Sequence, residues 1–329
     1  MTRTQIARTG VAERPRTPQG RPAEGPRGAA GRRRETLAGY LFLTPWCVGV
    51  LLLTLGPMLV SLYLAFTDYN LFDSPRWIGL RNFRDMFADD RWWHSVRVTL
   101  EYVLVGTPLK LAAALGVALL LVRPRRGQGF YRSAFYAPSL IGASVSIGIV
   151  WRSVFQDDAV VDRAMHFVGW DAGGWVGDPD WSLPTLVTLT VWQFGAPMVI
   201  FLAGLKQVPR ELYEAAEVDG AGAWRRFRSI TLPMISPVLF FNLLLELVHS
   251  FQVFTSAVVL GGSGGGAGGP ADSLLVYTWY LYEQGFRNLR MGYASAMAWM
   301  LMLGIGLLTA VLFRTQRNWV HYEEGTDAR

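Results

Sequence analysis

Cysteine, lysine and histidine are scarce in this 329-residue chain. Its single cysteine, Cys47, excludes an intramolecular disulfide and a thiolate metal cluster. Neither of its two lysines, Lys110 and Lys206, stands in the G-x-x-x-x-G-K-[ST] pattern that cradles nucleotide phosphates. The four histidines lie too far apart for an H-E-x-x-H metal site. We therefore expect no catalytic residues, no metal and no cofactor in this chain, and no ATP hydrolysis by it.

Charge is also sparse, and long apolar runs take its place. Only 17% of the residues are charged, whereas a soluble domain carries about a quarter. A helix needs about 20 apolar residues to cross the hydrocarbon core of a bilayer. Because backbone groups in lipid must bond within the segment, each such run predicts a helix, and the chain is expected to be an all-α membrane protein with six transmembrane helices. The six windows are 37–66, 98–122, 131–151, 182–205, 234–259 and 291–313.

Arginine is abundant, and its distribution predicts an orientation. Residues 1–36, 123–132, 206–228 and the tail after residue 313 together carry 21 Lys and Arg, and the alternate connections carry 9. The positive-inside rule therefore places both termini in the cytoplasm. These arginines flank apolar runs instead of lining an aromatic-studded face, so no nucleic-acid partner is expected.

The same features divide the chain into three parts. Residues 1–36 are rich in Arg, Pro and Gly and predict a disordered cytoplasmic tail. Residues 37–313 are expected to form the transmembrane domain, and residues 314–329 a cytoplasmic C-terminal tail.

A charged segment, ELYEAAEVDGAGAWRRFRSITLP, separates the fourth and fifth windows. Pro209 and the glutamates that follow it favour the start of a helix. The pair Asp219-Gly220 predicts its end, because glycine readily takes the left-handed conformation that terminates helices. A second short, basic helix is predicted from about Gly222 to Ser229. From the residues alone, this pair could lie on the membrane surface or serve as a contact surface for another protein.

The residue pattern of this segment resembles the EAA loop of the membrane subunits of binding-protein-dependent ABC importers. Further stretches, among them WIGLRNFRDMF and VWQFGAPMVIFLAGLKQVPRELYEAA, resemble the carbohydrate-type (maltose-permease-like) permeases, so that the resemblance runs from about residue 38 onward. One departure is DDAVVDRAM, where the family often has Gly-x-x-Asn; its Asp157, Asp158 and Asp162 are expected to form a solvated face. The positions that match the EAA pattern are Glu214, Ala215, Ala216, Asp219, Gly220, Ala221, Phe227, Ile230, Leu232 and Pro233.

The resemblance implies a type I importer permease fold in a bacterial plasma membrane, with residues 209–233 as a coupling helix seated in a cytoplasmic ATPase. Glu214 would face basic residues of that ATPase, Ala215 and Ala216 would permit close approach, and Asp219 and Gly220 would supply the turn. The implied partners are a second permease chain, expected to be a different one, two ATP-binding subunits that hydrolyse the ATP, and an extracytoplasmic solute-binding protein. The implied substrate is a sugar or glycerol-3-phosphate-like solute. The alternative is a stand-alone secondary transporter or channel, against which stand the loop and the lack of an obvious inverted repeat.

Polar groups within the apolar windows are functional candidates, because ionisable side chains are costly in a membrane. Lys110 and Glu246 are both expected near mid-bilayer, and we hypothesise that they approach each other; the alternative is that each pairs separately or extends toward the interface. Other candidates along a translocation pathway are the amides of Gln193, Asn242 and Gln252 and the ring of Trp192, for which helix–helix packing is an equally good explanation.

Overall fold

The computed structural model of the chain describes residues 29–123, 126–142, 144–156, 158–167, 169, 174–262 and 268–320. Most of the predicted N-terminal tail (residues 1–28), the end of the C-terminal tail (residues 321–329) and Asp157 lie outside the described residues. The chain divides into two compact units, Met1–Leu59 and Val60–Arg329.

The described part of the first unit is one long helical run. Helix α1 (Ala29–Gly49) continues through a π-helical turn, η1 (Val50–Leu55), into α2 (Gly56–Ala65), which enters the second unit. None of the side chains from Gly39 to Leu59 is buried, and Leu53 is 80% exposed. A helix that is apolar all round without a buried face fits a lipid environment. Helix α1 also begins inside the tail predicted for residues 1–36, where Ala, Arg and Glu are good helix formers.

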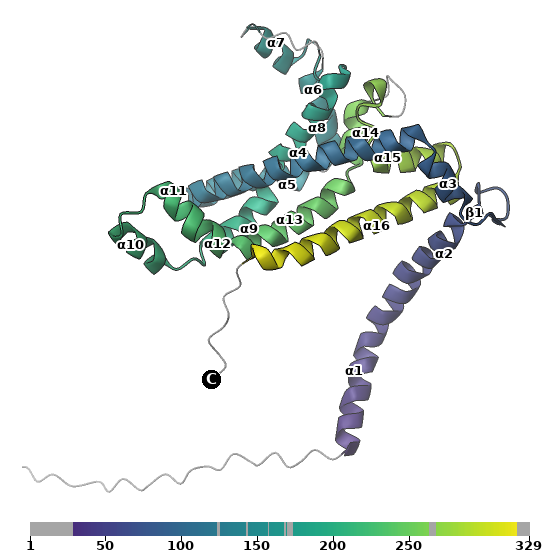
Figure 1. The fold of residues 1–329 in the computed structure, drawn as a ribbon, viewed down its shortest axis with the longest axis horizontal. Coiled ribbons are helices and arrows are strands. Elements are labelled where there is room, and N and C mark those ends of the chain that lie inside the picture. Colours follow the sequence, from purple (N-terminus) through teal and green to yellow (C-terminus); the bar gives the residue numbers. More distant parts are fainter. Residues whose placement is uncertain are drawn as a thin grey trace, which may run out of the picture. The chain divides into compact units, whose positions relative to one another are not determined.

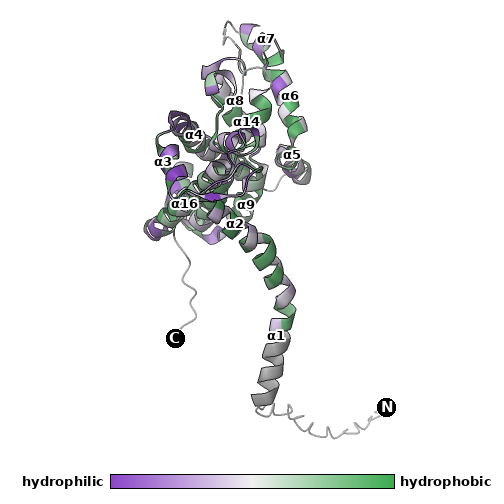
Figure 2. Ribbon diagram, turned by 90° about the vertical axis from the view of Figure 1, so that its right-hand side faces the viewer, coloured by the Kyte–Doolittle hydropathy of each residue, from purple (hydrophilic) through white to green (hydrophobic). Residues whose placement is uncertain are grey.

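A small hairpin opens the second unit. Strands β1 (Thr67–Asp68) and β2 (Arg76–Trp77) pair antiparallel, and α3 (Arg81–Phe87) follows them. The buried Asn82 amide donates hydrogen bonds to the carbonyl oxygens of Ala65 and Thr67, both at 2.9 Å. Helix α3 and the adjoining start of α4 are mainly hydrophilic, in contrast with α2 (Figure 2).

Helix α4 (Asp90–Leu121) is the central element of the second unit (Figure 1). It packs against α8 (Pro179–Trp192), α9 (Gly195–Leu205), α13 (Ser236–Phe251) and α15 (Tyr277–Tyr282). Its small residues Ala114 and Ala118 are fully buried and lie in one apolar cluster with Phe201 of α9. Asp89 begins the helix by accepting a hydrogen bond from the Arg91 amide at 3.0 Å, which satisfies one of the free amides of the first turn.

Three helices are long and apolar enough to cross a membrane alone: Gly39–Ala65, Asp90–Leu121 and Met291–Thr315. Three more candidates are bent pairs, so the described residues contain three to six spans. Helices α8 and α9 meet at 44°, and the run Ala223–Met234 meets α13 at 68°. The remaining pair joins α5 (Gln128–Ile141) to the run Val145–Phe167, which holds α6 (Val145–Phe155) and α7 (Val160–Phe167).

Glycine permits the close packing at the α8–α9 bend. A β-carbon on Gly195 would lie 2.5 Å from the carbonyl oxygen of Phe135 in α5, and one on Gly142 would lie 2.4 Å from the Gln193 side chain. Neither distance leaves room for a side chain.

One prediction from the sequence is wrong in this part of the chain. Asp162 was expected in a solvated face, but it is buried and accepts a hydrogen bond from the Asp158 amide at 3.1 Å, because α7 turns this carboxylate back toward its own N-terminus.

The other elements of the second unit are short, except for the last long helix. The remaining elements are α10 (Arg210–Val218), α11 (Ala223–Arg226), η2 (Phe227–Thr231), α12 (Leu232–Met234), α14 (Thr255–Gly261), η3 (Pro270–Asp272), η4 (Glu283–Arg287), α16 (Met291–Thr315) and η5 (Gln316–Asn318).

Candidate functional site

The charged segment between the fourth and fifth predicted windows forms two short helices. Helix α10 follows Pro209 directly and ends at Val218, with Asp219 as its C-cap, and α11 begins after Gly222. The Ala221 amide donates to the Ala216 carbonyl at 2.8 Å, and the Gly220 amide donates to the Glu217 carbonyl at 3.0 Å. With Gly220 at φ 72°, these two bonds form a Schellman motif. The predicted helix, glycine turn and second helix are therefore present.

Two contacts join these helices into one piece. The Arg226 guanidinium pairs with the Glu217 carboxylate, and the hydroxyls of Tyr213 and Thr231 are hydrogen-bonded at 2.9 Å. Trp224 stacks on Phe227 with ring centroids 5.6 Å apart. The segment is held by its own side chains, and we call Arg210–Thr231 the helix pair.

The helix pair presents an exposed surface. Glu214, Ala215, Asp219 and Gly220 are exposed, and Ala216 is half-buried. The Glu214 side chain makes no hydrogen bond or ion pair with the part of the chain that the structure describes. Val218 and Trp224 are 89% and 71% exposed. A monomer gains little from leaving large apolar side chains beside an unpaired carboxylate, whereas a partner protein could cover both.

A cavity of about 810 Å³ lies between the helix pair and the C-terminal end of α4. Leu119, Leu120 and Arg123 line it from the α4 side, and Tyr213 and Glu217 line it from α10. The C-terminal end of α4 thus faces the helix pair across this cavity.

Lys110 and Glu246 form an ion pair, as the hypothesis of their approach requires. The Lys110 ammonium donates to Glu246 Oε1 at 2.6 Å, and the two side chains are only 12% and 7% exposed. One turn away along the same interface of α4 and α13, the hydroxyls of Thr107 and Ser250 are hydrogen-bonded at 3.0 Å. Pairing between two long apolar helices is the arrangement expected for charges at membrane depth.

Asn242 continues this polar row on α13. Because Asn242, Glu246 and Ser250 are spaced by four residues, they share one face of the helix. The Asn242 side chain is 3% exposed, and its amide nitrogen has no hydrogen-bond partner among the described residues. Two side chains of this row, Glu246 and Ser250, are thus bonded to α4, and the amide nitrogen of Asn242 has no partner among the described residues.

The other candidates do not join this row. Gln193 donates to the Gly142 carbonyl at 3.1 Å, and Trp192 packs against Trp151 with ring centroids 5.4 Å apart. Both contacts belong to helix packing, the alternative explanation for these residues. Gln252 caps the end of α13 and is exposed.

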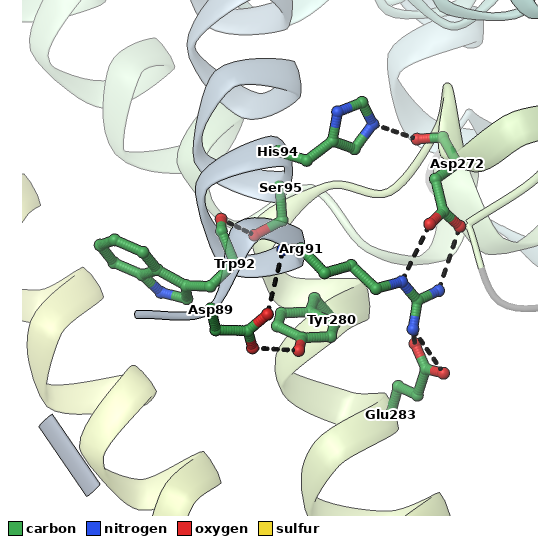
Figure 3. Close-up of polar contacts among 8 residues, drawn as sticks. All are labelled: Asp89, Arg91, Trp92, His94, Ser95, Asp272, Tyr280 and Glu283. Atoms are coloured by element: carbon green, nitrogen blue, oxygen red, sulfur yellow. Dashed lines mark hydrogen bonds and ion pairs between the residues drawn. The ribbon is translucent and has the colours of Figure 1, made fainter. Parts of the chain in front are cut away.

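A polar cluster that the sequence did not predict surrounds the start of α4 (Figure 3). Arg91 donates from Nε and Nη2 to the Asp272 carboxylate at 2.9 and 3.0 Å, and from Nη1 to Glu283 at 3.0 Å. Asp89 accepts hydrogen bonds from the hydroxyls of Tyr280 and Tyr293, the latter at 2.8 Å. The N-cap role of Asp89 is readable from the sequence, but its distant partners carry no sequence signal.

Hydrogen bonds lower the pKa of Asp89 against the effect of burial. Burial alone would raise the pKa of this carboxyl, but the hydrogen bonds from Tyr280 and Tyr293 and from the amides of Arg91 and Trp92 hold the pKa below its usual value of 3.8. Burial, and then the hydrogen bond to the Asp89 carboxylate, raise the pKa of Tyr280 above its usual range. The cluster therefore holds a carboxylate and a phenol that donates to it.

The described residues were also compared with the grouping that a metal ion requires. Among the described residues no three His, Cys, Asp or Glu side chains are grouped to hold a metal ion. The site that remains is the helix pair, together with the polar row at membrane depth.

The chain is similar to a known protein family and to individual transport proteins. The family described as "Binding-protein-dependent transport system inner membrane component" matches residues 102–320. The probable ABC transporter permease protein YesP of Bacillus subtilis (strain 168) is 47% identical over 88% of this chain and 94% of its own length. The probable starch degradation products transport system permease protein AmyD of Thermoanaerobacterium thermosulfurigenes is 31% identical over 85% of this chain and 94% of its own length.

A solved structure shares the fold. A chain of the bacterial alginate ABC transporter, in complex with an alginate pentasaccharide-bound periplasmic protein, matches with a TM-score of 0.74 at 22% identity, over 87% of this chain and 95% of that one.

Proposed function

We propose that this chain, which belongs to the family of binding-protein-dependent transport system inner membrane components, forms with a second, different permease chain the path of an importer for a sugar or related polar solute. Two ATP-binding subunits would drive it, and an extracytoplasmic solute-binding protein would deliver the solute. The names of relatives such as AmyD, which refer to sugar transport, support this substrate class. A free monosaccharide, an oligosaccharide and a glycerol-phosphate-type solute all fit it.

The observation that carries the proposal is the exposed helix pair. Helix α10 ends in a Schellman turn and is tied to α11 by an ion pair, so the segment is held in one conformation. Its Glu214 has no partner among the described residues and is therefore available to another protein. In the proposed importer, Glu214 contacts basic residues of an ATPase, Ala215 and Ala216 allow close approach, and Asp219 and Gly220 form the turn. Closure of the ATPases would then move the membrane helices between two discrete arrangements.

The topology follows from the same proposal. Residues 37–313 would form the transmembrane domain, with each of the three bent pairs as one span and six spans in total. The helix pair, the segment 1–36 and the tail 314–329 would then lie in the cytoplasm. The excess of Lys and Arg in these segments supports that orientation. The start of α4 with Arg91 would lie on the outer side of a bacterial plasma membrane.

We propose that the polar row on α13, together with Lys110, which pairs with its Glu246, lies next to the solute path. The Lys110–Glu246 ion pair has no net charge, so it would not bind a solute too tightly for release. The amide nitrogen of Asn242, which has no partner among the described residues, would be a donor for a solute hydroxyl. Gln252 is exposed at the end of the same helix and can contribute there. The ring of Trp192 and the amide of Gln193 would have a smaller part, because both are engaged in helix packing.

Uptake by the reconstituted assembly tests the proposal. We expect uptake of a labelled solute into vesicles to require the ATP-binding subunits, and Glu214→Ala to reduce it by more than roughly tenfold, because a charged contact with the partner is lost. Glu211→Ala is the matched control, since Glu211 is an equally exposed acid one turn earlier on α10. The solute would be chosen by screening mono- and oligosaccharides and sn-glycerol-3-phosphate against the purified solute-binding protein. Uptake without ATP-binding subunits, or full uptake by Glu214→Ala, would overturn the proposal.

A further inference from the structure

Helix α10 presents two different faces. The spacing of four residues places Glu214 and Val218 together on one face, which is exposed, and Tyr213 and Glu217 together on another. The second face lines the cavity of about 810 Å³ that lies between α10 and the C-terminal end of α4 (Figure 1). The proposed contact with an ATPase uses the first face, so it leaves the cavity on the second face unexplained.

The walls of this cavity are mainly apolar. The apolar side chains that line it from α4, α9 and the helix pair include Leu119, Leu120, Leu205, Trp224 and Phe227. Leu120 is 67% exposed and Trp224 is 71% exposed, so these two side chains do not close the space by packing together. Large apolar side chains that border an open cavity indicate a ligand with an apolar part.

The charges around the cavity are unbalanced. The described residues that line it carry two guanidinium groups, on Arg123 and Arg226, and one carboxylate, on Glu217. Arg226 pairs with Glu217, whereas Arg123 is exposed and makes no hydrogen bond or ion pair with the part of the chain that the structure describes. One positive charge therefore remains in the lining. A guanidinium is suited to a phosphate, because its planar set of donors matches two phosphate oxygens.

The position of the cavity along α4 matches the headgroup region of a bilayer. Helix α4 is long and apolar enough to cross a membrane. Its apolar run ends at Val122, and the basic sequence Arg-Pro-Arg-Arg follows from residue 123. Such a change from apolar to basic residues is typical of the level at which a span leaves the hydrocarbon core. Tryptophan is enriched at the same level, and Trp224 lines the cavity there.

We propose that this cavity binds an anionic phospholipid of the bilayer, with the headgroup phosphate at Arg123 and an acyl chain against Leu120 and Trp224. Basic pockets beside membrane-spanning helices recognise anionic headgroups by the same combination of charge and position. The lipid would fill the space between α4 and the helix pair, so that the membrane itself supports the segment. The inference goes beyond the proposed function, because it requires only that α4 spans a membrane, whichever solute is carried.

The test measures binding of a short-chain lipid, dioctanoyl phosphatidylglycerol, to the full chain in detergent. Binding is followed as the shift in the midpoint of thermal unfolding with lipid concentration. We expect this lipid to stabilise the chain more than dioctanoyl phosphatidylcholine, whose headgroup has no net charge, and more than inorganic phosphate, which has no acyl chain. Arg123→Gln should weaken binding roughly fivefold, the scale of one basic residue near an anionic lipid surface. Arg126→Gln is the matched control, because Arg126 is exposed three residues away and does not line the cavity.

A second variant changes the charge of the cavity in the opposite direction. Glu217→Gln removes the one carboxylate among the described residues of the lining and releases the Arg226 guanidinium. We therefore expect phosphatidylglycerol to bind this variant more tightly than the unsubstituted chain. A general loss of structure would instead weaken binding in Arg123→Gln and Glu217→Gln alike, and that result would contradict the proposal.

Further results would also overturn the inference. One is equal stabilisation by the two lipids or by phosphate alone, since the site would then not recognise an anionic lipid. Another is unchanged binding in Arg123→Gln, or an equal loss in Arg126→Gln, which would indicate diffuse attraction to a basic chain. If Arg123→Gln does not fold, Leu120→Asn tests the apolar wall at an exposed position, where unchanged binding would count against a lipid. Release of the lipid on addition of the ATP-binding subunits would assign the cavity to their contact instead.

Discussion

The charged side chains near the two ends of α4 differ in whether they are bonded within the chain. At the start of the helix, Arg91 bonds Asp272 and Glu283, which are 181 and 192 residues away in the sequence. Near the other end, Glu214 of α10 is exposed and bonds nothing in the part of the chain that the structure describes. A charge bonded inside the chain fixes geometry, whereas an exposed charge costs little in water and remains available to a partner. The first end is thus bonded within the chain, and in the proposed importer the helix pair near the second end is completed by another subunit.

The buried pair between these two ends should give the largest effect on stability. Lys110→Met would leave the Glu246 carboxylate buried without its partner, which we expect to lower the free energy of unfolding by about 3–5 kcal/mol. Thermal or denaturant unfolding of the purified chain in detergent measures this loss. Lys110→Met combined with Glu246→Leu should recover most of it, and Lys206→Met, at an exposed lysine, should change little. A single variant as stable as the unsubstituted chain would show that the pair is not desolvated.

The complete end should be sensitive to acid. The pKa of Asp89 is lowered by folding, so its carboxylate stabilises the fold above the unfolded value of 3.8, and this contribution is lost as the pH falls through the lower folded value. Asp89→Asn should lower the free energy of unfolding at neutral pH by about 2 kcal/mol, the scale of hydrogen bonds to a charged group. It should also flatten the dependence of unfolding on pH below about pH 5, where the Asp89 carboxyl takes up its proton in the unfolded chain before it does so in the folded one. Asp90→Asn, at the neighbouring exposed acid, should follow the unsubstituted profile.

The turn of the helix pair should show a smaller effect that depends on backbone conformation. A β-carbon meets no atom within 4 Å at Gly220 or at Gly222, but φ is positive, at 72°, only at Gly220. Gly220→Ala should therefore cost about 1 kcal/mol, with faster amide exchange in the last turn of α10, and Gly222→Ala should cost less than about 0.5 kcal/mol. Equal effects at both glycines would show that the Schellman turn does not depend on the left-handed residue.

The open end should show the smallest effect on stability. Because Glu214 bonds nothing within the described residues, Glu214→Ala should change the free energy of unfolding by less than about 0.5 kcal/mol, even though uptake by the assembly falls. Unfolding of the purified chain and uptake by the assembly, measured on one preparation, separate the two effects. A marked loss of stability would mean that Glu214 serves the fold and not a partner.

Sequence reasoning recovered the features that depend on local chemistry. Apolar windows located the long helices, and Asp219-Gly220 located the turn of the helix pair, because a glycine that must be left-handed leaves a local signal. The approach of Lys110 and Glu246 was also predictable, since two opposite charges in apolar windows have few other partners.

Bends and distant pairs were not predictable from the sequence. The break between α8 and α9 lies where Gly195 packs closely against Phe135 of α5, and this contact leaves no local signal in the sequence. The Arg91–Asp272 pair joins residues 181 positions apart, and neither residue type is unusual in its place. Asp162 was expected in a solvated face, but its burial depends on the direction in which a short helix turns.

The close approach of Gly261 and Gly269 has a practical consequence for engineering the chain. A β-carbon on Gly261 would lie 3.2 Å from the Gly269 α-carbon and 2.5 Å from the Trp279 ring, so the two ends of the intervening stretch are held together. Lengthening a closed loop costs only about 0.6 kcal/mol for each doubling of its length. Residues 263–267, Ser-Gly-Gly-Gly-Ala, are therefore a suitable place to insert an epitope or a fluorophore site that reports which side of the membrane this end faces.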